Sequence, residues 1–252
     1  MIPLLFALLA GPSFAAPTPG ELVFMLETVD DRTENNGDYQ ASVFIEQKEK
    51  DKSDLVFQAI VYRRDMDDML SILMAKPSSE AGKGYLRVDK NLFFYDPAVG
   101  KWERRTERER IGGTNSQRQD FDQSRLAEEF VPTFVGEEKL GNFAVNRLKL
   151  DVREGADVAY PIVELWLDVN TGNVLKRQDF ALSGKLMRTT YYPKYRTMFS
   201  ETKGADVYIA EEVRIFDEIE KGKNTTVVVQ DVNLSALEEN VFTKAWLESK
   251  SR

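Results

Sequence analysis

Short segments in which apolar and polar residues alternate follow one another along most of this chain. Between residues 55 and 105 these segments are rich in β-branched and aromatic residues, which favour strands, and breaks containing Gly, Pro, Asn or Asp separate them. The pattern predicts an antiparallel meander. The predicted strands are 55–64, 69–76, 84–88, 92–95 and 101–105, with turns at 89–91 and 96–100.

A second series of alternating segments continues almost to the carboxyl end. Their alternation predicts strands with one face exposed to water, and Gly-containing or polar breaks between them predict hairpins. We therefore expect one long, mainly β fold of the α+β class, whose bulky apolar residues need cover on both faces. The additional predicted strands are 142–152, 159–169, 173–182, 185–195, 207–217 and 225–234.

Helical patterns are few, and the sequence predicts helices only near residues 21–30, 122–131 and 240–249. In the middle one, Leu126, Phe130 and Phe134 recur every four residues, and Asp122 is placed to cap the first turn. We interpret this segment as a lid helix over the sheet. The residues before it, 111–121, predict an irregular, mobile loop.

The amino terminus, MIPLLFALLAGPSFA, is an apolar run that ends in small residues. With Ser13 and Ala15 at the −3 and −1 positions, it predicts a signal peptide at residues 1–15, cleaved after Ala15. The alternative is a buried amphipathic helix. Residues 16–252 then form one domain, and they contain no other apolar run approaching the length of about 20 residues that spans a bilayer. We expect a soluble, exported protein.

The composition excludes several classes of chemistry. The chain contains no His and no Cys, so nucleophile systems that use imidazole and most zinc, copper and non-haem iron sites are ruled out. We therefore expect no metal, no cofactor and no enzymatic activity. A carboxylate-only glycosidase stays as an alternative, but among 42 acidic residues a suitable pair always exists, so spacing does not support it. The net charge of −8 argues against nucleic-acid binding.

An arginine-rich segment, WERRTERERIGG, follows the first meander. Because Glu103, Glu107 and Glu109 alternate with its arginines, we expect a solvated, salt-bridged edge, with a docking surface for a membrane partner as the alternative. Residues 112–116, GGTNS, lack the Lys and the strand-to-helix context of a phosphate-binding loop, and they predict an ordinary loop.

These segments together resemble the outer-membrane lipoprotein-sorting proteins of the LolA-like superfamily. The resemblance covers nearly all of the chain after the signal peptide, although GGTNSQRQDF is longer than the turn expected before the Asp-Phe pair. The matching residues are Arg63-Arg64, Lys83-Gly84-Tyr85-Leu86, Leu92-Phe93-Phe94-Tyr95-Asp96-Pro97, Arg104-Arg105, Asp120-Phe121, the paired hairpins of YPIVELWLDVNTGNVLKRQDFALSGKLMRTTYY, and VFTKAWL.

The resemblance implies a curved antiparallel sheet that forms an incomplete β-barrel, or half-barrel, closed by a few helices over an apolar cavity. It implies a periplasmic carrier or chaperone that binds acyl chains of lipoproteins or other lipids in this cavity and ferries them between the inner and outer membranes. An ABC-type or RND-type transporter and an outer-membrane acceptor are the implied partners. The alternative is an envelope module that senses a lipid or lipoprotein and regulates a membrane partner.

Large apolar side chains suit such a cavity because moving an acyl chain through water costs about 0.8 kcal/mol per CH₂. Ordinary core packing is the alternative for each of them, since alternation defines the two faces of a sheet without showing which is concave. The candidate cavity residues are Phe57, Ile72, Met74, Leu86, Phe94, Trp102, Leu126, Phe130 and Trp166.

Overall fold

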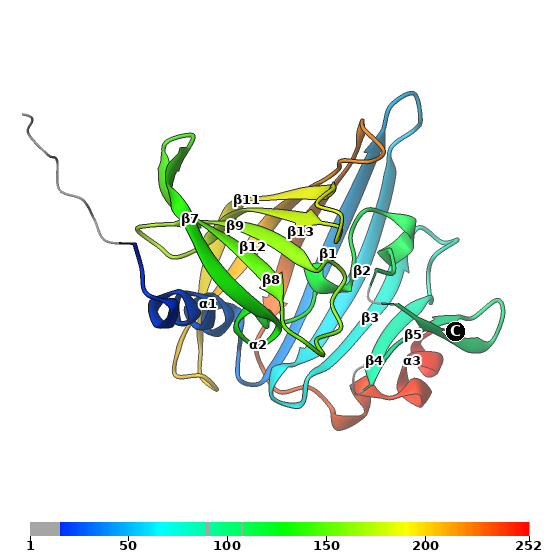
Figure 1. Cartoon of the computed structure of the whole chain (residues 1–252). Coiled ribbons are helices and arrows are strands. Elements are labelled where there is room, and N and C mark those ends of the chain that lie inside the picture. Colours follow the sequence, from blue (N-terminus) through cyan, green and yellow to red (C-terminus); the bar gives the residue numbers. More distant parts are fainter. Residues whose placement is uncertain (1–15, 89–90, 107, 252) are drawn as a thin grey trace, which may run out of the picture.

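The computed structural model describes residues 16–88, 91–106 and 108–251, and within them 13 strands form one antiparallel sheet that is not closed (Figure 1). The predicted signal peptide and part of the predicted turn at 89–91 lie outside these residues. The strands are β1 (Asp38–Glu49), β2 (Leu55–Arg64), β3 (Met69–Lys76), β4 (Gly84–Val88), β5 (Asn91–Asp96), β6 (Lys101–Arg105), β7 (Phe130–Leu140), β8 (Phe143–Val152), β9 (Ile162–Asp168), β10 (Val174–Phe180), β11 (Leu186–Ser200), β12 (Ala205–Asp217) and β13 (Lys223–Asn233).

The strand order explains how a meander produces a half-barrel with a filled interior. The order is β6-β5-β4-β3-β2-β1-β13-β12-β11-β10-β9-β8-β7, so every neighbouring pair except β1 and β13 is consecutive in the chain. Strand β1 thus joins the two halves of the sheet, with Val43 opposite Ala59 on one side and Val229 on the other. The end strands β6 and β7 are joined by a segment that passes over the concave side. We call residues 108–129 the crossing segment.

The meander predicted between residues 55 and 105 is confirmed. Strands β2, β3, β4 and β6 have the predicted bounds, and β5 is one residue longer at each end. Two strands are additional to the predicted set, β1 and β7. In β1, Tyr39, Val43 and Ile45 do point inward in alternation, but the strand also contains Asp, Glu and Lys, which are depleted in strands.

The predicted lid helix at 122–131 is wrong in extent. Helix α2 (Leu126–Glu129) is a single turn, and Phe130 and Phe134 belong to β7. Alternate positions from Phe130 onward also satisfy a strand, and pairing with β8 decides between the two. The expected cap is different too, because the carboxylate of Asp30 accepts hydrogen bonds from the Leu126 and Ala127 amides at 2.9 and 2.8 Å.

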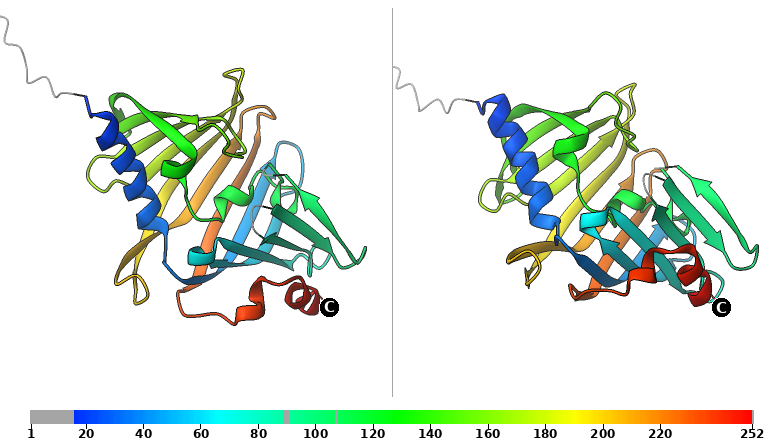
Figure 2. Two further views of the ribbon diagram at one scale, coloured as in Figure 1. Left: turned by 60° about the horizontal axis from the view of Figure 1, so that its bottom comes forward. Right: turned by 90° about the horizontal axis from the view of Figure 1, so that it is seen from below.

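Helix α1 (Pro19–Thr33) lies over one half of the concave side, where it packs against α2, β7 and β12 (Figure 2). A capping box between Thr18 and Glu21 fixes its start. Its apolar face, Leu22, Leu26 and Val29, packs in a core with α2 and strands β7 to β9. The helix therefore closes this half of the sheet from the inside.

The other half of the concave side is covered by the crossing segment, which contributes Ile111 and Phe121 to the main core. The outer face there is covered by α3 (Lys244–Lys250). A side chain at Gly84 would meet Leu247 of α3, whereas the hydroxyl of the next residue, Tyr85, bonds to the crossing segment. In this half of the sheet, elements therefore pack on both faces, as the apolar pattern of the first meander predicts.

Candidate ligand cavity

A cavity of about 200 Å³ lies between the concave side of the sheet and the crossing segment. Its lining has two parts of different character. The sheet and α1 supply apolar and tyrosine side chains, among them Val29, Val43, Val61, Val213, Val227, Val229, Tyr39, Tyr192, Tyr195 and Tyr208. The opposite wall is largely charged. Together with Arg63 of β2 and Arg177 of β10, it supplies Arg118, Asp120, Asp122, Arg125 and Glu129.

Two nearby aspartates of the crossing segment attach it to opposite halves of the sheet. Arg188 of β11 donates two hydrogen bonds to Asp120, at 2.9 and 2.6 Å. On the other side, Nη1 of Arg87 in β4 lies 3.5 Å from the carboxylate of Asp122. These ion pairs are buried, so they fix the position of the cavity wall more firmly than surface pairs do.

Arg188 belongs to a buried charge chain that continues along the sheet. Its Nε donates to Asp179 at 2.7 Å, and Arg177 donates to the other oxygen of Asp179 at 2.7 Å. Burial by itself raises the pKa of this carboxyl, but the two guanidinium groups outweigh burial and hold the pKa of Asp179 below its usual value. Asp179 therefore stays ionised inside the fold.

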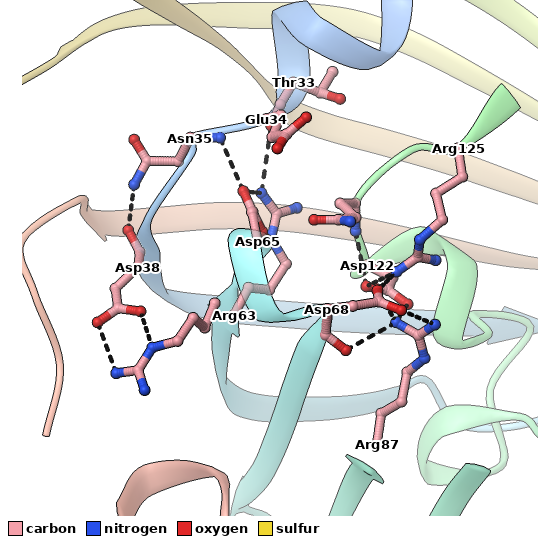
Figure 3. A network of polar contacts seen from close by, with 12 residues as sticks. Thr33, Glu34, Asn35, Asp38, Arg63, Asp65, Asp68, Arg87, Asp122 and Arg125 are labelled. Atoms are coloured by element: carbon pink, nitrogen blue, oxygen red, sulfur yellow. Dashed lines mark hydrogen bonds and ion pairs between the residues drawn. The ribbon is translucent and has the colours of Figure 1, made fainter. Parts of the chain in front are cut away.

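Asp122 is the meeting point of several arginines (Figure 3). Arg87 donates at 2.7 Å to the carboxylate of Asp68, next to its contact with Asp122. Nη2 of Arg125 lies 3.7 Å from Asp122 and also pairs with Asp68, and Arg118 bonds to Asp122 from the preceding turn. The negative charge of Asp122 is thus compensated from three directions.

The paired arginines at the end of β2 have separate partners, and Figure 3 shows those of Arg63. Arg63 lies 3.0 Å from the carboxylate of Asp65 and donates to the Thr33 carbonyl at the end of α1, at 3.3 Å. Arg64 donates to the carboxylate of Asp38 at 2.7 Å. These contacts fix the end of α1 and the start of β1 beside the cavity.

Several polar side chains that line the cavity have no hydrogen-bond partner among the described residues, and they include the Glu129 carboxyl, the Gln123 side chain and the hydroxyls of Tyr39, Tyr192 and Tyr208. Burial raises the pKa of Glu129 above its usual value, against the attraction of Arg125, Arg118 and Arg177. Burial also raises the pKa of Tyr192 to about 12. Hydrogen-bonding groups are therefore available inside the cavity.

The structure brings two of the nine predicted cavity residues to the cavity, and their role in binding stays a prediction. Leu126, in the crossing segment, and Phe130, at the start of β7, line it. Four others pack in the main core on the concave side without lining the cavity. These are Phe57, Ile72, Met74 and Phe94.

The remaining three predicted residues lie on the outer face of the sheet. Trp102 pairs with Tyr95, and its indole donates to Glu248 of α3 at 2.6 Å. Leu86 shares the outer face with Gly84, two positions away. Trp166 bonds to Glu138, and the Lys176 ammonium lies 3.9 Å from its ring centroid. Alternation in the sequence shows which residues share a face of the sheet, but it does not show which face is concave.

The buried charges of the crossing segment are what sequence reasoning missed. Charged residues are rarely buried unless paired, so the run QRQDFDQSR gives no local sign of burial. The predicted mobile loop at 111–121 is corrected for the same reason. Thr114, Asn115 and Ser116 are buried, and the Asn115 amide donates to the Thr225 hydroxyl at 3.2 Å.

The arginine-rich segment forms a salt-bridged edge, as the alternating charges predict. Arg105 pairs with Glu103 at 2.7 Å and approaches Glu109 at 3.6 Å. Arg110 reaches across to Asp217 at 2.9 Å. Within the described residues, no group of three or more Asp, Glu, His or Cys side chains is placed to hold a metal ion.

Three solved structures share this architecture. A LolA superfamily protein from Nitrosomonas europaea superposes with a TM-score of 0.76 at 19% identity, covering 92% of this chain and 100% of its own. A putative outer membrane lipoprotein-sorting protein domain from Vibrio parahaemolyticus superposes with a TM-score of 0.79 at 18% identity, covering 92% of this chain and 100% of its own. A DUF1329 family protein from Desulfovibrio piger superposes with a TM-score of 0.80 at 15% identity, covering 91% of this chain and 98% of its own.

The chain therefore has the LolA-like fold, which confirms the resemblance seen in the sequence at the level of architecture. A family model described as "-like: Uncharacterized protein" matches residues 65–249, and the chain belongs to that family. A comparison with curated proteins gave no match. In the described part of the chain, no helix is long and apolar enough to cross a membrane.

Proposed function

We propose that this protein is a periplasmic carrier that binds the acyl chain of a lipoprotein or another lipid in the cavity beneath the crossing segment. The observation that carries the proposal is the position of this cavity, on the concave side of a LolA-like half-barrel, with a floor of valine and tyrosine side chains. Apolar floor residues stabilise an acyl chain by removing it from water, at about 0.8 kcal/mol per CH₂.

The size of the cavity suits part of a lipid rather than a whole one. Its volume of about 200 Å³ is below the range of roughly 300–1,000 Å³ usual for sites that enclose drug-sized ligands. A longer chain therefore enters only if side chains or the crossing segment shift. Loading by an inner-membrane ABC-type or RND-type transporter and delivery to an outer-membrane acceptor complete the proposed cycle, without covalent chemistry.

Identification of the bound lipid tests the proposal. The full chain is expressed with its own amino terminus, purified from the periplasmic fraction without detergent, and analysed by native mass spectrometry. We expect a mature chain that begins at or next to Ala16 and carries a lipid or lipopeptide of defined mass. A protein that retains Met1, or that leaves the periplasm without bound lipid and does not bind a fluorescent fatty acid, contradicts the carrier function.

A further inference from the structure

The polar groups in the cavity that lack a partner indicate which hydrogen-bonding groups the ligand has beside its acyl chain. Glu129 is half-buried at the end of α2 and lines the cavity, and its carboxyl forms no hydrogen bond or ion pair with another described residue. Its neighbour Glu128 is exposed to solvent. A carboxylate that is partly removed from water gains from a hydrogen-bond donor, and a hydrocarbon chain cannot supply one.

The arginines near Glu129 do not serve as its partners because each is engaged elsewhere. Arg177 donates to Asp179 at 2.7 Å and to Gln119 at 3.3 Å. Arg118 and Arg125 pair with Asp122. The Glu129 oxygens therefore remain available to a molecule that enters the cavity.

The same cavity also contains donors without acceptors. Tyr39 is 7% exposed, and its ring is covered by the Arg63 guanidinium at 4.4 Å from the centroid, yet its hydroxyl has no partner among the described residues. The hydroxyl of Tyr192 is likewise unpaired. A ligand that satisfies this lining needs both an acceptor for a hydroxyl and a donor for a carboxyl.

We propose that the cavity recognises an acyl chain through an amide linkage, with the amide N–H donating to Glu129 and the carbonyl accepting from a tyrosine hydroxyl. An ester of the same chain offers only acceptors, so it leaves Glu129 unpaired. This inference rests on the proposed function, because it specifies how the acyl chain is attached to the rest of the ligand.

A matched pair of probes tests the proposal. N-methyldecanamide and methyl decanoate have the same acyl chain and differ in the N–H group, and each is titrated against a bound fluorescent fatty acid on the full mature chain. Moving the amide out of water costs more free energy than moving the ester. A cavity that offers no hydrogen-bond acceptor for the N–H group therefore binds the ester more tightly. We expect the wild-type protein to bind the amide about ten-fold more tightly, the value of a hydrogen bond to a charged group.

Three variants locate the effect. Glu129→Met keeps the length of the side chain and removes both oxygens, so we expect the amide preference to disappear while ester binding is retained. Glu128→Met is the matched control on the exposed side of α2, and it should keep the preference. Tyr39→Phe should weaken both probes several-fold, since both carry a carbonyl. A thermal melt of each variant confirms that it is folded.

Two results overturn the inference. One is an equal or higher affinity of the wild-type protein for the ester, and the other is an unchanged amide preference in folded Glu129→Met. If neither probe displaces the fluorescent fatty acid from the wild-type protein and the fatty acid itself does not bind, the carrier function fails together with the inference. Binding of the ester alone leaves the carrier function standing.

Discussion

Arg188 and Asp120 form a two-point ion pair between strand β11 and the crossing segment, with donor–acceptor distances of 2.9 and 2.6 Å. Their side chains are only 4% and 3% exposed. The pair therefore holds the wall of the cavity against the sheet from inside the fold. Breaking one side of such a pair leaves a buried charge without compensation, which is more costly than losing a surface ion pair.

We expect Asp120→Asn to lower the free energy of unfolding by about 3 kcal/mol, since Arg188 then keeps only Asp179 as an anionic partner. Urea denaturation followed by tryptophan fluorescence measures the change. Asp157→Asn is the control, because Asp157 is exposed, and it should change stability by no more than about 0.5 kcal/mol. Equal stability of the two variants would show that the ion pair contributes nothing.

The position of α3 on the outer face gives a second prediction. A methyl group at Gly84 would lie 2.5 Å from the nearest side-chain carbon of Leu247, which is fully buried. We expect Gly84→Ala to destabilise the protein by about 1–3 kcal/mol and to increase proteolysis of the carboxyl-terminal residues. Gly20→Ala has open space around it and should be neutral or slightly stabilising. A fully stable Gly84→Ala variant would contradict the packing of α3.

Tyr85 makes stability fall at alkaline pH. Its hydroxyl accepts a hydrogen bond from the Gly112 amide at 3.1 Å, and burial raises its pKa to about 12. An unfolded tyrosine ionises near pH 10, so between pH 10 and 12 the unfolded state releases a proton that the folded state retains. The contribution of neutral Tyr85 is thus complete below pH 10 and is lost as pH rises through 12.

In Tyr85→Phe, we expect a loss of about 1 kcal/mol at neutral pH from the missing hydrogen bond, and a shallower decline of stability between pH 10 and 12. Denaturation curves across this range measure both effects. An identical decline in the variant and the wild type would assign the alkaline sensitivity to other groups, of which Tyr192 is the first candidate.

Leu126 is 5% exposed and packs in the core that α1 and α2 share with strands β7 to β9. Leu126→Ala should therefore cost about 3 kcal/mol in the free energy of unfolding, and it should also weaken acyl-chain binding, because Leu126 lines the cavity. Val131→Ala, at an exposed position of β7, is the control for the loss of apolar side-chain carbon atoms. A Leu126→Ala variant with unchanged stability and unchanged acyl-chain binding would show that Leu126 contributes neither to the core nor to the binding site.

The sequence by itself determined most of the strands of this protein. Alternation within 55–64 or 69–76 is a local property that survives in the fold, because each of these strands has neighbours on both sides that bury its apolar positions. Apolar positions at 126, 130 and 134 fit a helix and a strand almost equally well, so local pattern predicted a lid helix where the chain forms β7.

The tertiary structure alone decided which face of the sheet is concave and what lies inside it. Charged residues such as Asp120, Asp122 and Arg188 have no local pattern that signals burial, since each becomes stable inside only when a partner distant in the chain compensates its charge. The position of Glu129 at the cavity, and of Trp102 and Trp166 on the outer face, is likewise decided by which segments cover each side of the sheet.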